Sequence, residues 1–357
     1  MAQQHLEPTD PLARPVTGEA LAGYLRCQAT EFLRALRRLR ESGAGGGAPA
    51  RGRPGVADSG SPESAQAARA LRRSARRISG SLHTYRPLLD ADWSEGMRPE
   101  LAWLSGTLAL EHAFSARLER LLAALHRLSG SAGLPVQPGT PGGAPPAPER
   151  GSLTVGAAKA SALLDRQLTL ARTRAHSTAL QALGSSRFHA VADKVALLAS
   201  EVPLTQAAAD TDLRALAAAA EERLTDAVAA LPLVTAGSPY NAEALVHGLS
   251  TDPAPHPQDA PWHQVRLLLR LHRYAREVLQ GQDGPVNVRL LAAGQALDRH
   301  RDASEAAAAA AQAARTPRIA PATAYALGVL HADQRHEVEA ARFAFQRSWQ
   351  KQTVAAP

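Results

Sequence analysis

Two stretches of the chain place positively charged side chains at the same helical spacing. The first contains Arg69, Arg72 and Arg76, and the second contains His263, Arg266, Arg270 and Arg273. At about 100° per residue, offsets of three, seven and ten residues fall within an arc of roughly 80° on a helix. We therefore expect two helices, each with a ridge of cations along one face, and the repetition indicates an internal duplication.

A ridge of arginines is chemically suited to a polyanion. The planar guanidinium grips phosphate oxygens with two parallel hydrogen bonds. Arg73 and Arg77 crowd the first ridge further, and each like-charge pair three or four residues apart costs about 0.2–0.5 kcal/mol in an isolated helix. A bound anion, or carboxylates from another helix, would relieve this repulsion. The alternatives are a solvated charged face that binds nothing and, for Arg273, an ion pair with Glu277 one turn away.

The composition of the 357 residues indicates an all-α protein. Aromatic residues make up only 4% of the chain, apolar residues recur at helical spacing, and no run of alternating β-branched residues predicts a strand. The net charge of +7 favours acidic partners without identifying one. Cys27 is the single cysteine, which excludes a disulfide framework and a cysteine-based zinc site.

The sequence shows no targeting or membrane-spanning segment. Residues 1–15 lack the apolar core of a signal peptide, and no apolar run approaches the length of a membrane span. We therefore expect a cytoplasmic protein that makes no membrane contact.

Stretches rich in Pro and Gly divide the chain into helical segments. Residues 43–62 and 130–150 predict two flexible linkers. Helices are expected over residues 17–42, 63–89, a segment that follows Pro99, 153–182, 186–199, 205–230, 262–281, 286–315 and 321–349.

Signatures of enzymes are missing from the sequence. No lysine follows a glycine, so the Gly-Lys end of a phosphate-binding loop does not occur, and there is no Gly-x-Ser-x-Gly nucleophile elbow. His331 and His336 are five residues apart, which directs them to different sides of a helix and makes them a poor metal pair. We therefore expect no catalytic residue, no metal site and no cofactor.

The second ridge carries a family resemblance. The segment from His263 to Glu277 resembles the second signature of the CHAD family, the conserved histidine α-helical domains, and matches it at each signature position, including Tyr274. Downstream, residues 297–302 resemble the family's Leu-Gly-x-His-x-Asp motif, with Asp298 in place of Gly and His300 as the histidine.

The first ridge resembles the family's first signature less closely. Arg69 stands where the family has its histidine, and His112-Ala113 stands where it has Arg-Asp. Residues 186–188, Ser-Arg-Phe, resemble a further short motif. The resemblance covers the chain from about Thr17 to Trp349.

The resemblance implies two helical bundles related by a pseudo-two-fold axis around a shared basic groove. On this basis the first half would cover residues 17–200 and the second half residues 205–350. It also implies binding of inorganic polyphosphate, association with polyphosphate granules and their other proteins, and a place for His300 among the binding residues. The expected polyphosphate ligands are therefore Arg69, Arg72, Arg73, Arg76, Arg77, His263, Arg266, Arg270, Arg273 and His300.

Two other classes of function share the positive charge. A nucleic-acid-binding protein would need an aromatic platform or a helix-turn-helix, and the sequence predicts neither. An enzyme acting on phosphate polymers or nucleotides would need a general acid, a general base or a metal beside the cations. Asp302 near His300 is the single hint of such a group, and a salt bridge inside the bundle explains it equally well. Because the second half keeps the full pattern, we expect it to contribute more to binding than the first.

Overall fold

A computed structural model describes residues 17–44, 62–130, 149–238, 256–281 and 287–350, together with isolated positions between these ranges. The two predicted linkers, residues 43–62 and 130–150, lie almost entirely outside the described residues. Within the described ranges the backbone is helical and forms no strand, apart from a single isolated bridge between Leu89 and Leu204. The all-α prediction is confirmed.

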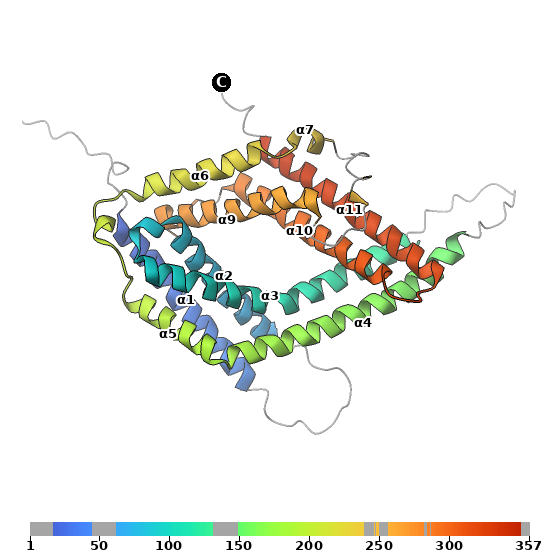
Figure 1. The fold of residues 1–357 in the computed structure, drawn as a ribbon, viewed down its shortest axis with the longest axis horizontal. Coiled ribbons are helices and arrows are strands. Elements are labelled where there is room, and N and C mark those ends of the chain that lie inside the picture. Colours follow the sequence, from blue (N-terminus) through green and yellow to red (C-terminus); the bar gives the residue numbers. More distant parts are fainter. Residues whose placement is uncertain are drawn as a thin grey trace, which may run out of the picture. The chain divides into compact units, whose positions relative to one another are not determined.

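The α-helices follow the predicted order (Figure 1). They are α1 (Gly18–Ala44), α2 (Pro62–Thr84), α3 (Ala91–Leu128), α4 (Glu149–Leu183), α5 (Ser186–Ser200), α6 (Leu213–Ala229), α7 (Leu233–Ala236), α9 (Ala260–Gln280), α10 (Val288–Ala314) and α11 (Pro321–Gln350). Within the described ranges, three 3₁₀ turns accompany them: η2 (Arg86–Leu88), η3 (Gln206–Ala208) and η4 (Pro257–Asp259).

Several helix boundaries differ from the sequence-based expectation. The helix expected over residues 63–89 ends at Thr84, the one expected over 205–230 begins only at Leu213, and the short helix α7 was not expected. We expected the third helix to follow Pro99, but α3 begins at Ala91 and continues through this proline. The Asp90 carboxylate accepts a hydrogen bond from the Trp93 backbone N–H at 2.8 Å, which satisfies an end of the helix. Met97 and Leu101 on either side of Pro99 are buried, so packing holds the turn that the proline weakens.

The chain forms two compact units, each assembled from separate segments. The first comprises Met1–Leu108, Ala182–Arg223 and Arg270–Pro285, and the second comprises Ala109–Gln181, Leu224–Leu269 and Val286–Pro357. The boundary falls within α9, so its first half belongs to the second unit and its second half to the first. The division into halves at about residue 200, the internal duplication and the shared groove stay predictions.

In the first unit, α1 packs against α2 and α5. The second half of α9 also approaches α2 closely, because a Cβ at Gly80 would lie 2.5 Å from the Tyr274 ring. The Tyr85 hydroxyl, on the turn after α2, donates a hydrogen bond to the Ala275 carbonyl oxygen at 3.1 Å. The helix with the first ridge is therefore held against the helix with the second ridge inside this unit.

In the second unit, α10 packs along α11 (Figure 1). The alanine run of α10 forms this contact: Ala306, Ala307 and Ala310 are buried, and they share a core cluster with Leu327 and Leu330 of α11 or lie beside it. Small side chains let the two helix backbones approach. The run, whose alanines also favour the helical conformation, therefore decides the packing of α10.

A buried ionic cluster fixes the start of α9 in the second unit. Asp259, the last residue of η4, is fully buried, and its Oδ2 accepts a hydrogen bond from Arg335 at 2.8 Å. Its Oδ1 accepts one from Arg342 at 2.7 Å, and the Ser304 hydroxyl also donates to the carboxylate. Arg342 in turn donates to the buried Glu339 at 2.7 Å. The cluster therefore ties η4 to α10 and α11.

Charges in this cluster balance, which allows it to be buried. Burial alone would raise the pKa of the Asp259 carboxyl, but its hydrogen bond and ion pair with Arg335 hold that pKa well below its usual range. The neighbouring His300 is almost fully buried, and burial, reinforced by the positive charge of Arg342, lowers its pKa to about 3. His300 is therefore neutral at physiological pH, and its Nε2 accepts a hydrogen bond from Arg342.

Replacing Asp259 with Asn should destabilise the protein strongly. The change leaves Arg335 and Arg342 with Glu339 as their remaining buried counter-charge, and breaking a buried ion pair from one side costs about 3–5 kcal/mol. Urea denaturation followed by circular dichroism measures the loss. The matched control is Asp333→Asn, which removes a carboxylate paired with the half-exposed Arg127 and should cost at most about 1 kcal/mol. Equal losses for the two variants would contradict a special role for the cluster.

Acid should lower the free energy of unfolding over the pH range between the unfolded and folded pKa values of His300. Its pKa is lowered from 6.5 to about 3 in the folded state, so the unfolded chain binds more protons between these pH values. The contribution that the neutral His300 makes to stability is complete above pH 6.5 and is lost progressively as the pH falls toward 3. The free energy of unfolding should therefore drop by up to about 2 kcal/mol between pH 6.5 and 4.5. In a His300→Gln variant, whose amide keeps an acceptor for Arg342, the drop should be smaller, and an unchanged slope would exclude His300 as its source.

Candidate anion-binding site

The predicted ligands of a polyanion fall into both compact units. Within the first unit lie the cations of α2 and those of the second half of α9: Arg69, Arg72, Arg73, Arg76, Arg77, Arg270 and Arg273. Within the second unit lie His263, Arg266 and His300. Counter-charges compensate these two groups to very different degrees.

In the first unit, Arg77 has a structural role at the contact of α2 with α9. Its Nε donates to Glu277 Oε2 at 2.7 Å and its Nη2 to Oε1 at 3.2 Å, while the Tyr24 hydroxyl donates to the same carboxylate at 2.8 Å. Burial lowers the pKa of the Arg77 guanidinium, but the hydrogen bond and charge of Glu277 outweigh it and raise that pKa. Glu277 thus binds Arg77 and Tyr24 across the helices, and no ion pair joins it to Arg273 within the described residues.

Four of the other candidate cations in this unit, Arg69, Arg73, Arg76 and Arg273, have no counter-charge among the described residues. Arg76 is partly exposed, and its buried Nε has no hydrogen-bond partner within the described part of the chain. Arg69 and Arg73 are exposed and Arg273 is partly exposed, and no hydrogen bond or ion pair joins any of them to another described residue. Because α2 and α9 are in contact, these arginines lie on neighbouring helices of one unit. The first unit therefore presents a set of arginines whose charge is not neutralised by described residues.

In the second unit, the charge of the candidate ligand Arg266 is compensated by a carboxylate. Arg266 donates from Nε to Asp298 Oδ1 at 2.6 Å. The neighbouring Arg301 pairs with Asp302 and lies 3.7 Å from Glu305, and Glu305 accepts from Arg117 at 2.6 Å. Three carboxylates of α10 therefore pair with Arg266 of α9, Arg301 of α10 and Arg117 of α3.

The two histidines of this unit are not equivalent. His300 is buried and stacks on the Trp262 indole, with ring centroids 5.6 Å apart. His263 is partly exposed and meets the edge of His300, with centroids 5.5 Å apart. Burial lowers the pKa of His263 as well, so both rings are predominantly neutral at physiological pH. His300 supports the start of α9 from inside, whereas His263 reaches the surface beside Arg266.

Some residues that matter here escaped the sequence analysis. Asp259, Arg335 and Arg342 form the ionic cluster, but their separation along the chain by 76 and 83 residues leaves no local signal. Trp262 was marked only as the start of a helix, although it is fully buried against His300 and Phe345. A signal did exist for Asp298, which replaces a glycine of the resembled motif, but its partner Arg266 emerged only from the tertiary structure.

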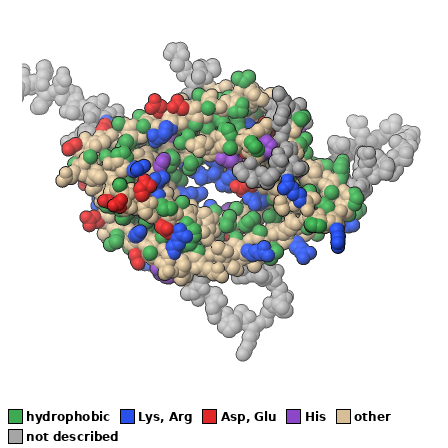
Figure 2. All heavy atoms as spheres, viewed as in Figure 1, with side chains coloured by type: hydrophobic (Ala, Val, Ile, Leu, Met, Phe, Trp, Pro, Cys, Tyr) green, Lys and Arg blue, Asp and Glu red, His purple; other side chains and the backbone are tan. Residues whose placement is uncertain are grey.

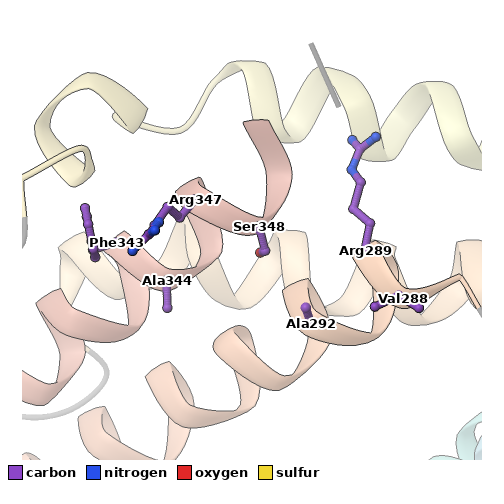
Figure 3. A pocket seen from close by; sticks show the side chains of 7 residues that line it. All are labelled: Val288, Arg289, Ala292, Phe343, Ala344, Arg347 and Ser348. Carbon is purple, nitrogen blue, oxygen red and sulfur yellow. The ribbon is translucent and has the colours of Figure 1, made fainter. Parts of the chain in front are cut away.

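A pocket of about 710 Å³ lies between α10 and α11 in the second unit (Figure 3). Ala292 and Ala344 are among its lining residues, and the side chains of Arg289 and Arg347 extend from the two helices. The Arg289 guanidinium lies over the Trp349 ring, 4.2 Å from its centroid. None of the predicted polyanion ligands lines this pocket, which therefore is not part of the candidate site.

The surface and composition of the described residues add three observations. Lys and Arg side chains recur over the face shown in Figure 2, with fewer carboxylates among them. No group of three or more His, Cys, Asp or Glu in the described ranges could hold a metal ion. Among the helices described, none is long and apolar enough to cross a membrane.

Comparisons with known proteins identify the family. The family model of the CHAD domain matches residues 51–311, which is more than half of the chain. Among solved structures, PptA from Streptomyces chartreusis is similar, with a TM-score of 0.75 and 69% sequence identity, over 95% of this chain and 100% of that chain. No curated protein matches. The extent of the family match, together with the basic helix signatures on α2 and α9, shows that this chain belongs to the CHAD domain family.

Proposed function

We propose that this protein binds inorganic polyphosphate through the arginines of α2 and α9, without catalysing a reaction on it. The observation that carries the proposal is the set Arg69, Arg73, Arg76 and Arg273, which no described carboxylate neutralises. Polyphosphate carries a charge on nearly every repeat unit, and a basic surface binds such a chain by direct ion pairs and by release of its condensed counterions. Association with polyphosphate granules would follow from this binding.

The repulsion among these arginines favours an anionic ligand. Arg69, Arg73 and Arg76 lie three or four residues apart on α2, so each close pair costs about 0.2–0.5 kcal/mol without a counter-charge. The Arg76 Nε is also removed from water without a described partner, which adds to the cost. An anion bound along the ridge would relieve both terms. The CHAD resemblance, which implies polyphosphate as the ligand, agrees with this chemistry.

Features that read nucleic-acid bases are missing from the candidate surface. Of the aromatic residues on α9, Trp262 is fully buried and Tyr274 packs against Gly80, so neither offers a stacking platform. The arginines present charge without a pattern of donors matched to base edges. A flexible phosphate polymer therefore fits the surface better than a duplex.

The pairing of arginines with carboxylates changes how much each of the two signatures is expected to contribute to polyphosphate affinity. On sequence alone the second signature was expected to dominate, since it keeps the full family pattern. Arg266 of that signature is paired with Asp298, however, whereas Arg76 of the first signature has no described counter-charge. We therefore propose that the arginines of the first unit, including Arg273 at the end of the second signature, carry most of the affinity.

The chain should bind long-chain polyphosphate more tightly than duplex DNA at matched phosphate concentration and physiological salt. Its affinity should also fall steeply with salt, with a slope of log K against log salt of about −0.7 per phosphate contact, the value for flexible single strands. Fluorescence anisotropy titrations over a range of salt concentrations measure both quantities. Tighter binding to DNA, or a slope near zero, would contradict the proposed function.

Arg76→Gln combined with Arg273→Gln should weaken polyphosphate binding by about tenfold or more, because each removes a charge-assisted contact. The matched control is Arg34→Gln with Arg127→Gln, which removes the same total charge from arginines paired with Glu31 and Asp333. The control should change affinity by less than about threefold, since exposed ion pairs contribute little. Equal losses in the two variants would mean that only net charge matters, and circular dichroism verifies that both remain folded.

A further inference from the structure

The ion pair between Arg266 and Asp298 places a carboxylate on the binding helix of the second unit. Both Nε and Nη2 of Arg266 reach Asp298 Oδ1, at 2.6 and 2.5 Å. These two nitrogens form one edge of the guanidinium, and this edge is the one that grips phosphate oxygens in pairs. Asp298 therefore holds the edge that a polyanion would use.

Exposure of the two side chains shows which partner a ligand meets first. The Arg266 side chain is only 13% exposed, whereas the Asp298 side chain is 54% exposed. The carboxylate thus lies on the solvent side of the pair, in front of a guanidinium that the protein largely covers. An approaching polyanion encounters a negative charge at this position before it can reach the arginine.

Asp298 is the first of three carboxylates along one face of α10. Asp302 and Glu305 follow at offsets of four and seven residues, which keeps all three within an arc of about 60°. Asp302 pairs with Arg301, and Glu305 accepts from Arg117 at 2.6 Å. Each carboxylate of the row therefore neutralises a different arginine, and Asp298 is the member that faces a signature residue.

We propose that Asp298 is an internal competitor of the polyanion: it occupies Arg266 in the unbound protein and must be displaced before this arginine binds phosphate. This inference rests on the proposed function. Its consequence is selectivity. A small anion must break the pair for one contact, whereas a polymer of many charges also gains contacts at other arginines. Asp298 thus raises the number of linked charges that a ligand needs at this position.

The test is an Asp298→Asn variant, which removes the carboxylate charge and nearly keeps the side-chain shape. Affinity for long-chain polyphosphate should rise by two- to fivefold, the range that a partly exposed ion pair is worth. The salt dependence should steepen by about 0.7 in slope, because one more phosphate contact forms. Affinity for tripolyphosphate should rise by at least the same factor, since the short anion has fewer other contacts.

Two further variants separate this effect from a general change in charge. Asp333→Asn removes the same charge from an arginine pair outside the candidate site and should leave affinity within about twofold of the unchanged protein. Asp298→Asn combined with Arg266→Gln should lose the gain, because the contact that the first change exposes is then missing. The full chain is used throughout, with circular dichroism to verify folding.

The outcomes discriminate between the inference and the function beneath it. Unchanged or weaker binding by Asp298→Asn, in a chain that otherwise binds polyphosphate, would overturn the competitor role and indicate that Asp298 orients Arg266 for the ligand. An equal gain in Asp298→Asn and Asp333→Asn would overturn it too, as an effect of net charge. If the unchanged chain fails to bind polyphosphate at all, this result overturns the proposed function and, with it, the inference about Asp298.

Discussion

The arrangement of helices in the second unit depends on the buried carboxylate of Asp259. Asp259 lies just before α9, with no exposure to solvent, and a single charge in such a place is costly. Arg335 and Arg342 from α11 and the hydroxyl of Ser304 from α10 surround it, so that three elements must meet at one point with correct geometry. The position at which the basic helix begins is therefore set by electrostatics, and not only by apolar packing.

This constraint extends to the candidate site through His300. The ring is kept neutral by burial and by Arg342, and it supports Trp262 on one face and His263 at its edge. The direction of the first turn of α9 follows from these contacts, because Trp262 also packs against Phe345 of α11. A family histidine thus acts in this chain as a support for the basic helix α9, whereas its neighbour His263 reaches the surface.

Counter-charges divide the arginines into two kinds. Arg77 and Arg266 have the same side chain as Arg76 and Arg273 and lie on the same two helices, yet the first two face carboxylates and the last two face none in the described residues. Pairing with a carboxylate changes the availability of a guanidinium to an anion more than its exposure to solvent does. A paired guanidinium holds helices together through its carboxylate partner, while an unpaired one keeps its donors available to an anion.

The sequence by itself determined the helical class, most helix positions and the two basic helices, because helical spacing and caps are local properties of the chain. The family resemblance, too, was carried by short motifs such as the one from His263 to Glu277. Only the tertiary structure decided which arginine is compensated. Asp298 lies 32 residues from Arg266, and Glu277 lies 200 residues from Arg77, and no local pattern links residues at such separations. Ion pairs form between whichever charges the packing of helices brings within a few ångströms, so their partners are a property of the fold as a whole.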